Sequence, residues 1–280
     1  MKANSKDSLG DRMKAHEDRT RYFLPMRTFT VIRLDGKSFH TFTRGCKKPF
    51  DRDLMDCMQF TALKLCEEIQ NVKLAYTQSD EITLILTDFD GRTTSPWFGG
   101  NLQKMVSVSA SIATAEFNKH WGQVTTKGFF GELQDDEFDH HGLVEEILKF
   151  QLELKSAHFD SRAYTVSEAW EAYNAVYWRQ NDASKNSVQM LARSLFPHKE
   201  LQNAKIPLLH DMIHSKGENW NDQPTDCKRG AFVVYDEGKG WRIDRDAPIL
   251  SQDKAYFFDK VPLYDQYRPE INEVVFEDAE

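Results

Sequence analysis

Apolar and polar positions in the first part of the chain predict a strand followed by a helix. Residues 28–34 are rich in β-branched side chains and end at the turn pair Asp35-Gly36, so we expect a buried strand that stops there. From Asp51 to residue 70, apolar side chains recur at steps of three and four residues, which is the spacing of one helix face. Asp51 stands where an N-cap residue is expected.

The next segment predicts a hairpin with an acidic tip. Residues 72–77 and 82–87 both have strand composition, and only the sequence Gln-Ser-Asp-Glu separates them. We therefore expect Asp80 and Glu81 at the tip of a hairpin. Residues 101–120 then predict a second helix, whose apolar and small side chains on one side suit close packing on a sheet.

The order of strand, helix, two strands and helix is that of a ferredoxin-like unit that still needs one strand. Residues 159–166 and residues 231–235 are the two candidates for it. The predicted fold class is α+β: a ferredoxin-like domain, in which an antiparallel sheet carries helices on one face, followed by a C-terminal lobe of mixed helical and β structure.

The second half of the chain predicts a long helix over residues 167–195, with a possible break in its middle, and a glycine-centred hairpin over residues 231–243. The stretch between the two halves is acidic, and we interpret it as an insertion. The chain then divides into a first domain at residues 1–121, the acidic insertion at 122–157 and the C-terminal lobe at 158–280.

Composition narrows the class of protein. The chain has 280 residues, of which 40% are hydrophobic, and this is enough to build a core. It contains no apolar run of membrane-spanning length and no secretory signal pattern, so we expect no membrane partner. The four scattered cysteines lack zinc-site spacing, which favours a reducing, cytoplasmic location. The net charge of −8 argues against a general nucleic-acid binder, although a local basic patch can still bind a phosphate backbone.

The predicted topology brings Asp35 and Asp80 together. In a split β-α-β unit the first two strands run parallel with the third between them, so the end of the first strand and the hairpin tip share one sheet edge. Two carboxylates at one edge form an oxygen-rich site suited to Mg²⁺, and such a site can hold two ions for phosphoryl transfer. The alternative is an ordinary turn and a solvated hairpin tip, which the pattern alone does not exclude.

Basic residues supply candidate phosphate contacts. Lys48 precedes the first helix and Lys104 lies in the second, so either can meet a triphosphate. Four others are candidates for contacts with an RNA backbone: Arg179, Lys185, Lys228 and Arg229. Each of these could equally be a solvated surface charge. The chain has neither a Walker A sequence nor an HExxH motif, so neither a P-loop nor a catalytic zinc site is supported.

Five ordered blocks of the chain resemble those of the tRNA(His) guanylyltransferase family. They are Arg33-Leu34-Asp35-Gly36-Lys37-Ser38-Phe39-His40, Lys48-Pro49-Phe50-Asp51, Ala75-Tyr76-Thr77-Gln78-Ser79-Asp80-Glu81, Phe159-Asp160-Ser161-Arg162 and Trp178-Arg179-Gln180-Asn181-Asp182. Five blocks in family order are more specific than any one of them. The resemblance therefore favours the metal-site interpretation over an ordinary acidic turn.

The resemblance implies a palm-like catalytic domain that adds nucleotides to the 5′ end of tRNA in the 3′-to-5′ direction, with GTP and ATP as nucleotides. It implies two Mg²⁺ ions held by Asp35, Asp80 and the backbone carbonyl of Gly36. Glu81 would be either a third ligand or a group that supports the ligands, and we favour the second role. The other nucleotide-binding positions implied are Lys37, Ser38, Phe39, His40, Lys48, Ser79 and Lys104. Family resemblance also implies a homotetramer, with the C-terminal lobe completing the nucleotide and tRNA site.

One block departs from the eukaryotic pattern. Eukaryotic members carry His-Ile-Asn-Asn after the Trp-Arg-Gln-x-Asp block, whereas this chain has Ser184-Lys185-Asn186-Ser187. It thereby resembles the bacterial and archaeal guanylyltransferase-like branch, which repairs truncated tRNA 5′ ends on a template base. Two other functions remain open: a palm-fold nucleotide cyclase or signalling-nucleotide synthase, and a non-catalytic RNA-binding module. The Trp-Arg-Gln-x-Asp block has no obvious role in the first, and the intact Asp35/Asp80 pair argues against the second.

Overall fold

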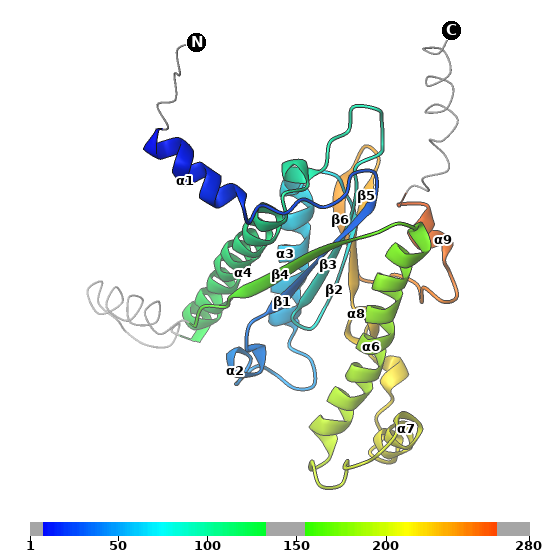
Figure 1. Ribbon diagram of the computed structural model, residues 1–280. Helices are drawn as coiled ribbons and strands as arrows, with labels where there is room; N and C mark the ends of the chain where they lie inside the picture. The colour runs from blue at the N-terminus through cyan, green and yellow to red at the C-terminus, as the bar shows by residue number, and fades with distance from the viewer. Residues whose placement is uncertain (1–7, 133–154, 262–280) are drawn as a thin grey trace, which may run out of the picture.

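A computed structural model describes residues 8–132 and 155–261 of the chain (Figure 1). Its centre is a six-stranded sheet with the order β4-β1-β3-β2-β5-β6, and all neighbouring strands are antiparallel. The strands are β1 (Phe29–Gly36), β2 (Val72–Gln78), β3 (Glu81–Thr87), β4 (Phe159–Val166), β5 (Ala231–Asp236) and β6 (Gly240–Asp244). The first four have the ferredoxin-like order, which confirms the predicted fold class. Both candidate segments join the sheet, β4 beside β1 and β5 beside β2.

Helices α3 (Arg52–Glu68) and α4 (Leu102–Glu132) cover one face of the sheet. The Asp51 carboxylate caps α3 by accepting a hydrogen bond from the backbone N–H of Leu54 at 3.0 Å, as the sequence predicted. The apolar stripe of α3 includes Ala62 and Leu65, which are fully buried. Helix α4 runs past its predicted end at residue 120.

The other face is covered by helix α6 (Ala169–Leu195) and the short helix α9 (Ala255–Phe258), so helices lie on both faces rather than on one. The reason is visible in the strands. All seven residues of β3 are buried, and a strand buried on both faces is a continuous apolar run rather than an alternating one. Helix α6 is unbroken and packs Val176 and its neighbours against this second face.

Besides α9, six short elements of the described residues were not predicted from the sequence. They are α1 (Leu9–Asp18), α2 (Phe39–Phe42), η1 (Trp97–Gly100), α7 (Ile206–Ser215), η3 (Trp220–Asp222) and α8 (Thr225–Arg229). Helix α1 buries no residue and projects away from the sheet in Figure 1. Helix α7 packs on the end of α6 through Leu209 and Ile213. Within the described ranges, no helix has the length and apolar character that crossing a membrane requires.

The predicted division at residues 121 and 157 stays a prediction. Strands from both sides of this division join one sheet, because β4, β5 and β6 extend the sheet begun by β1 to β3. Helix α4 continues across residue 121. Residues 133–154, which make up most of the predicted insertion, lie outside the described residues, and so does the acidic tail.

Candidate active site

Asp35 and Asp80 meet at one edge of the sheet. Strands β1 and β3 pair so that Asp35 lies opposite Glu81. The backbone N–H of Gly36 donates a 2.9 Å hydrogen bond to the carbonyl oxygen of Asp80. The end of β1 is thus joined to the tip of the β2–β3 hairpin, as the predicted topology required.

Glycine is required beside Asp35 because the chain turns tightly there. A Cβ at Gly36 would overlap the ring of Phe39. Phe39 is 4% exposed and packs against the rings of Phe42, Phe117 and Phe159. The aromatic core under α2 therefore holds the backbone of the Asp35-Gly36 turn in place.

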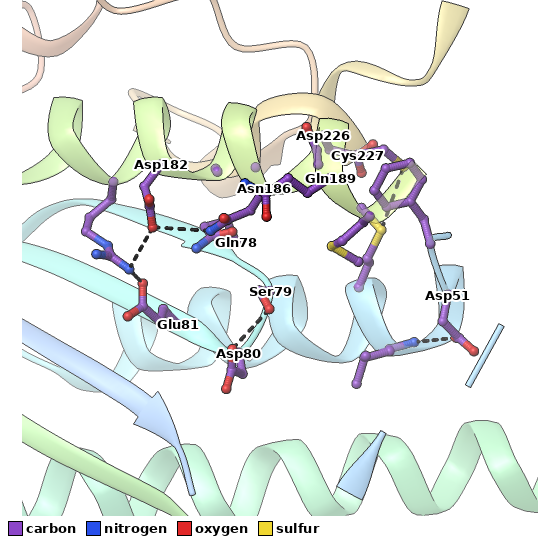
Figure 2. Close-up of a pocket in the computed structure, with 18 of the residues that line it drawn as sticks. Asp51, Gln78, Ser79, Asp80, Glu81, Asp182, Asn186, Gln189, Asp226 and Cys227 are labelled. Carbon is purple, nitrogen blue, oxygen red and sulfur yellow. Dashed lines mark hydrogen bonds and ion pairs between the residues drawn. The ribbon is translucent and has the colours of Figure 1, made fainter. Parts of the chain in front are cut away.

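Two arginines hold Glu81, the neighbour of Asp80. Arg33 Nη2 donates to Glu81 Oε1 and also to Asp35 Oδ2, the latter at 3.0 Å. Arg179 Nη2, from helix α6, donates to Glu81 Oε2 (Figure 2). Both oxygens of Glu81 are therefore engaged by guanidinium groups, and this favours a supporting role over metal ligation.

The charged form of Asp80 is disfavoured at this edge. Burial raises the pKa of Asp80, and the nearby charge of Asp35 raises it further, against a hydrogen bond from Ser79. Two carboxylates that repel each other in a partly buried place gain from a bound cation, whose charge relieves the repulsion. Carboxylate and carbonyl oxygens are also the ligands that Mg²⁺ prefers. Among the residues that the structure describes, no three or more His, Cys, Asp or Glu side chains are grouped so that they could hold a metal ion.

A pocket of about 400 Å³ opens beside Asp80. Its walls come from the hairpin tip, the start of α3, the middle of α6 and helix α8, and Figure 2 shows Asp182 and Asn186 of α6 lying across from Ser79 and Glu81. Asp182 accepts a hydrogen bond from the side-chain amide of Asn186 at 3.2 Å and pairs with Arg179 at 3.8 Å. Phe50, Arg179 and Ser187 also line this pocket.

The structure places some of the predicted nucleotide contacts at this edge. Lys37, Ser38 and His40 are exposed on and before helix α2, directly after Asp35. Ser79 is exposed at the hairpin tip. Lys48 is exposed two residues before Phe50, which lines the pocket. Their contacts with a nucleotide stay predictions.

Two residues that were predicted to contact the nucleotide, Phe39 and Lys104, do not present an exposed side chain at this edge. The Phe39 ring is part of the core, so its side chain is packed against other rings and does not face the site. Lys104 lies in the first turn of α4, which begins at the opposite end of the sheet from α2 (Figure 1). The backbone around it bonds to the segment before β1, with Leu24 donating to Gly100. Within this chain Lys104 does not join Asp35, and its contact with a triphosphate stays a prediction.

Sequence reasoning missed the arginines that organise the edge. Arg179 was a candidate surface charge, but it is 8% exposed and paired with Glu81. Its burial could have been inferred from its position three residues after Val176, which puts both residues on the buried stripe of α6. Lys228 also differs from a free surface charge, because its Nζ donates to the carbonyl of Asn221 at 2.6 Å.

A ferredoxin-like sheet with two carboxylates at the end of its first strand and at the adjacent hairpin tip defines a palm-like catalytic domain. The family model for tRNA(His) guanylyltransferase matches residues 10–167, and the chain belongs to this family. Its members catalyse 3′-to-5′ nucleotide addition to tRNA, and the chain is an enzyme of this kind. This assignment favours neither a nucleotide cyclase nor a non-catalytic RNA-binding module.

Three relatives illustrate the similarity. A bacterial tRNA(His) guanylyltransferase-like protein in complex with ATP is 39% identical, with a TM-score of 0.77 over 91% of this chain and 100% of the other. A bacterial protein of the same description in complex with GTP is 36% identical, with a TM-score of 0.69 over the same shares. A probable tRNA(His) guanylyltransferase of Dictyostelium discoideum is 26% identical over 75% of this chain and 76% of its own length.

Proposed function

We propose that Asp35, Asp80 and the backbone carbonyl of Gly36 hold two Mg²⁺ ions for nucleotide transfer to the 5′ end of tRNA. The observation that carries the proposal is the hydrogen bond between Gly36 and Asp80, because it fixes the two carboxylates at one sheet edge. The ions would supply neutralising charge for the transferring phosphoryl group and an orientation for the attacking oxygen. Glu81 acts as a support, since both of its oxygens bind arginines.

The nucleotides lie beside the exposed turn that follows Asp35. Lys37, Ser38 and His40 face solvent there, and Lys48 offers a point charge to a triphosphate. ATP first activates the 5′-monophosphate of the tRNA by adenylyl transfer, which releases pyrophosphate. The 3′-OH of GTP then attacks the activated 5′ phosphorus, and AMP leaves. The structures of bacterial relatives with ATP and with GTP support a site that accepts both nucleotides.

The chain repairs truncated tRNA 5′ ends on a template base in preference to adding a lone G opposite A. Its identity to the bacterial guanylyltransferase-like proteins, 39% and 36%, is higher than the 26% it shares with the Dictyostelium relative. In the segment that replaces His-Ile-Asn-Asn, only Asn186 and Ser187 line the pocket. The hydroxyl of Ser187 joins helix α6 to helix α8, because it donates a hydrogen bond to the carbonyl oxygen of Lys228 at 2.9 Å. No aromatic side chain of this segment is available to hold an unpaired nucleotide.

Two matched tRNAs test this preference. Both lack the 5′ nucleotide and carry a 5′-monophosphate, and they differ only in having C or A at the opposing position. With each labelled NTP in turn, we expect efficient G addition opposite C and little opposite A. Equal rates on the two tRNAs would contradict templated repair while leaving 3′-to-5′ addition intact.

We also propose a homotetramer in the cytoplasm. The assembly rests on family resemblance, and its size can be measured by sedimentation equilibrium. The location is supported by the four cysteines, which are all free thiols in the structure.

A further inference from the structure

Trp178 is an exposed aromatic residue next to Arg179, which lines the pocket of the candidate active site. It lies on α6 directly before Arg179 and is 59% exposed. The guanidinium carbon of Arg179 lies over the Trp178 ring, 4.5 Å from its centroid. The same guanidinium binds Glu81, which adjoins Asp80. One guanidinium group therefore links the indole to the carboxylate edge.

The other exposed tryptophan of this helix is packed differently. Trp170 is 50% exposed, but the ring of Phe258 lies 4.7 Å from it and the Lys254 ammonium 5.3 Å from it. Within residues 8–132 and 155–261, no aromatic ring packs against Trp178 in this way. Arg179 thus contacts the Trp178 ring, while more than half of the residue's surface is open to solvent.

We propose that Trp178 is a stacking platform for an unpaired base at the acceptor end of the RNA substrate. This inference rests on the proposed function and names the part of the RNA that the site receives. Stacking on an aromatic ring is the usual way in which proteins hold an unpaired base, and an arginine behind the ring adds a cation–π contribution. Because Arg179 is already bound to Glu81, the platform is held in place before the RNA arrives.

The open position of the ring favours RNA over a free nucleotide. Small-molecule sites enclose most of their ligand, whereas a polymer can lie along an exposed surface. Lys185 follows Trp178 by seven residues, which is two helical turns, and is also exposed. It lies on the same side of α6 and offers a charge to the phosphate next to a stacked base.

The test measures RNA binding in EDTA without any NTP, so it does not depend on nucleotide addition. One probe is an acceptor-stem hairpin with a recessed 5′ end and a single-stranded 3′ overhang, and the other is the same stem with a blunt end. For Trp178→Ala we expect roughly tenfold weaker binding of the overhang RNA, a typical loss for one base–aromatic stack, and little change for the blunt RNA. Trp178→Phe should lose less affinity for the overhang RNA than Trp178→Ala does. The control variant Trp170→Ala should bind both RNAs as tightly as the parent chain.

Three results would overturn the proposal. Equal losses on the overhang and blunt RNAs would place Trp178 in general RNA contacts or in stability. Unchanged RNA binding with a raised KM for GTP would place the ring at the nucleotide instead. A change in oligomeric state, seen by sedimentation of Trp178→Ala, would place it at a contact between copies of the chain. If Trp178→Ala shows the selective loss and no nucleotide addition occurs with any NTP, the platform stands and the proposed function fails.

Discussion

Gly36 donates its backbone N–H to the carbonyl oxygen of Asp80 at 2.9 Å, although 44 positions separate them in the sequence. The bond joins the end of β1 to the tip of the β2–β3 hairpin, and Asp35 pairs across the sheet with Glu81. The position of the two candidate metal ligands is therefore set by backbone pairing and not by flexible side chains. A site built on strand ends in this way is held more precisely than one on a loop.

The first prediction concerns the tight turn at Gly36. For Gly36→Ala we expect a loss of about 1–3 kcal/mol in the free energy of unfolding, because the added Cβ would overlap the buried Phe39 ring. Urea unfolding followed by circular dichroism measures it. Gly128→Ala is the control, because its Cβ would meet nothing within 4 Å and alanine favours a helix. Partial recovery in Gly36→Ala/Phe39→Leu would identify the ring as the cause, and an unchanged stability of Gly36→Ala would contradict the packing described.

The second prediction concerns the ion pair between Arg179 and Glu81. Arg179→Met should lower the free energy of unfolding by about 3 kcal/mol. This is near the low end for breaking a buried ion pair, because Glu81 keeps its second partner, Arg33. The double variant Arg179→Met/Glu81→Gln should be more stable than Arg179→Met alone, since it removes the charge left without its second partner. A double-mutant cycle in urea measures both. If the two single losses simply add, the pair contributes no coupling and Glu81 is not held by Arg179.

The third prediction concerns Lys48. For Lys48→Ala we expect the KM for GTP to rise several-fold with the tRNA KM little changed, because a lysine acts on a triphosphate as a point charge. Steady-state kinetics with one substrate varied at a time separates the two. Lys47→Ala is the matched control, because Lys47 is adjacent and also exposed. A rise in the tRNA KM alone would place Lys48 on the RNA-binding surface.

Much of the fold and the meeting of Asp35 with Asp80 could be predicted from the sequence. The strands β1 to β3 and helix α3 carry strong periodic patterns, and their order fixes which strand ends share an edge. Helix α1 was missed because it buries no residue and so carries no apolar stripe.

The network of side-chain contacts around Glu81 was harder to predict from the sequence. Arg179 pairs with Glu81 across 98 positions, and no local pattern reports such a contact. The position of Lys104, in contrast, followed from the topology. Strand β3 runs away from the Asp35 edge, so a helix that begins after β3 starts at the far end of the sheet. The family motif suggested a nucleotide contact there without showing where α4 begins.

The central claim is that Asp35 and Asp80 together carry the metal-dependent addition of a nucleotide to the tRNA 5′ end. The most direct measurement is the single-turnover transfer of labelled GTP to a 5′-truncated tRNA in Mg²⁺, comparing the parent chain with Asp35→Asn, Asp80→Asn and Asp160→Asn. Asp160 is the control, because it lies opposite Asp35 on β4, is exposed and pairs with Arg162 at 3.5 Å. We expect losses of at least ~10²-fold for Asp35→Asn and for Asp80→Asn with circular dichroism unchanged, and a near-parental rate for Asp160→Asn. A near-parental rate in a folded Asp35→Asn or Asp80→Asn variant would contradict the claim.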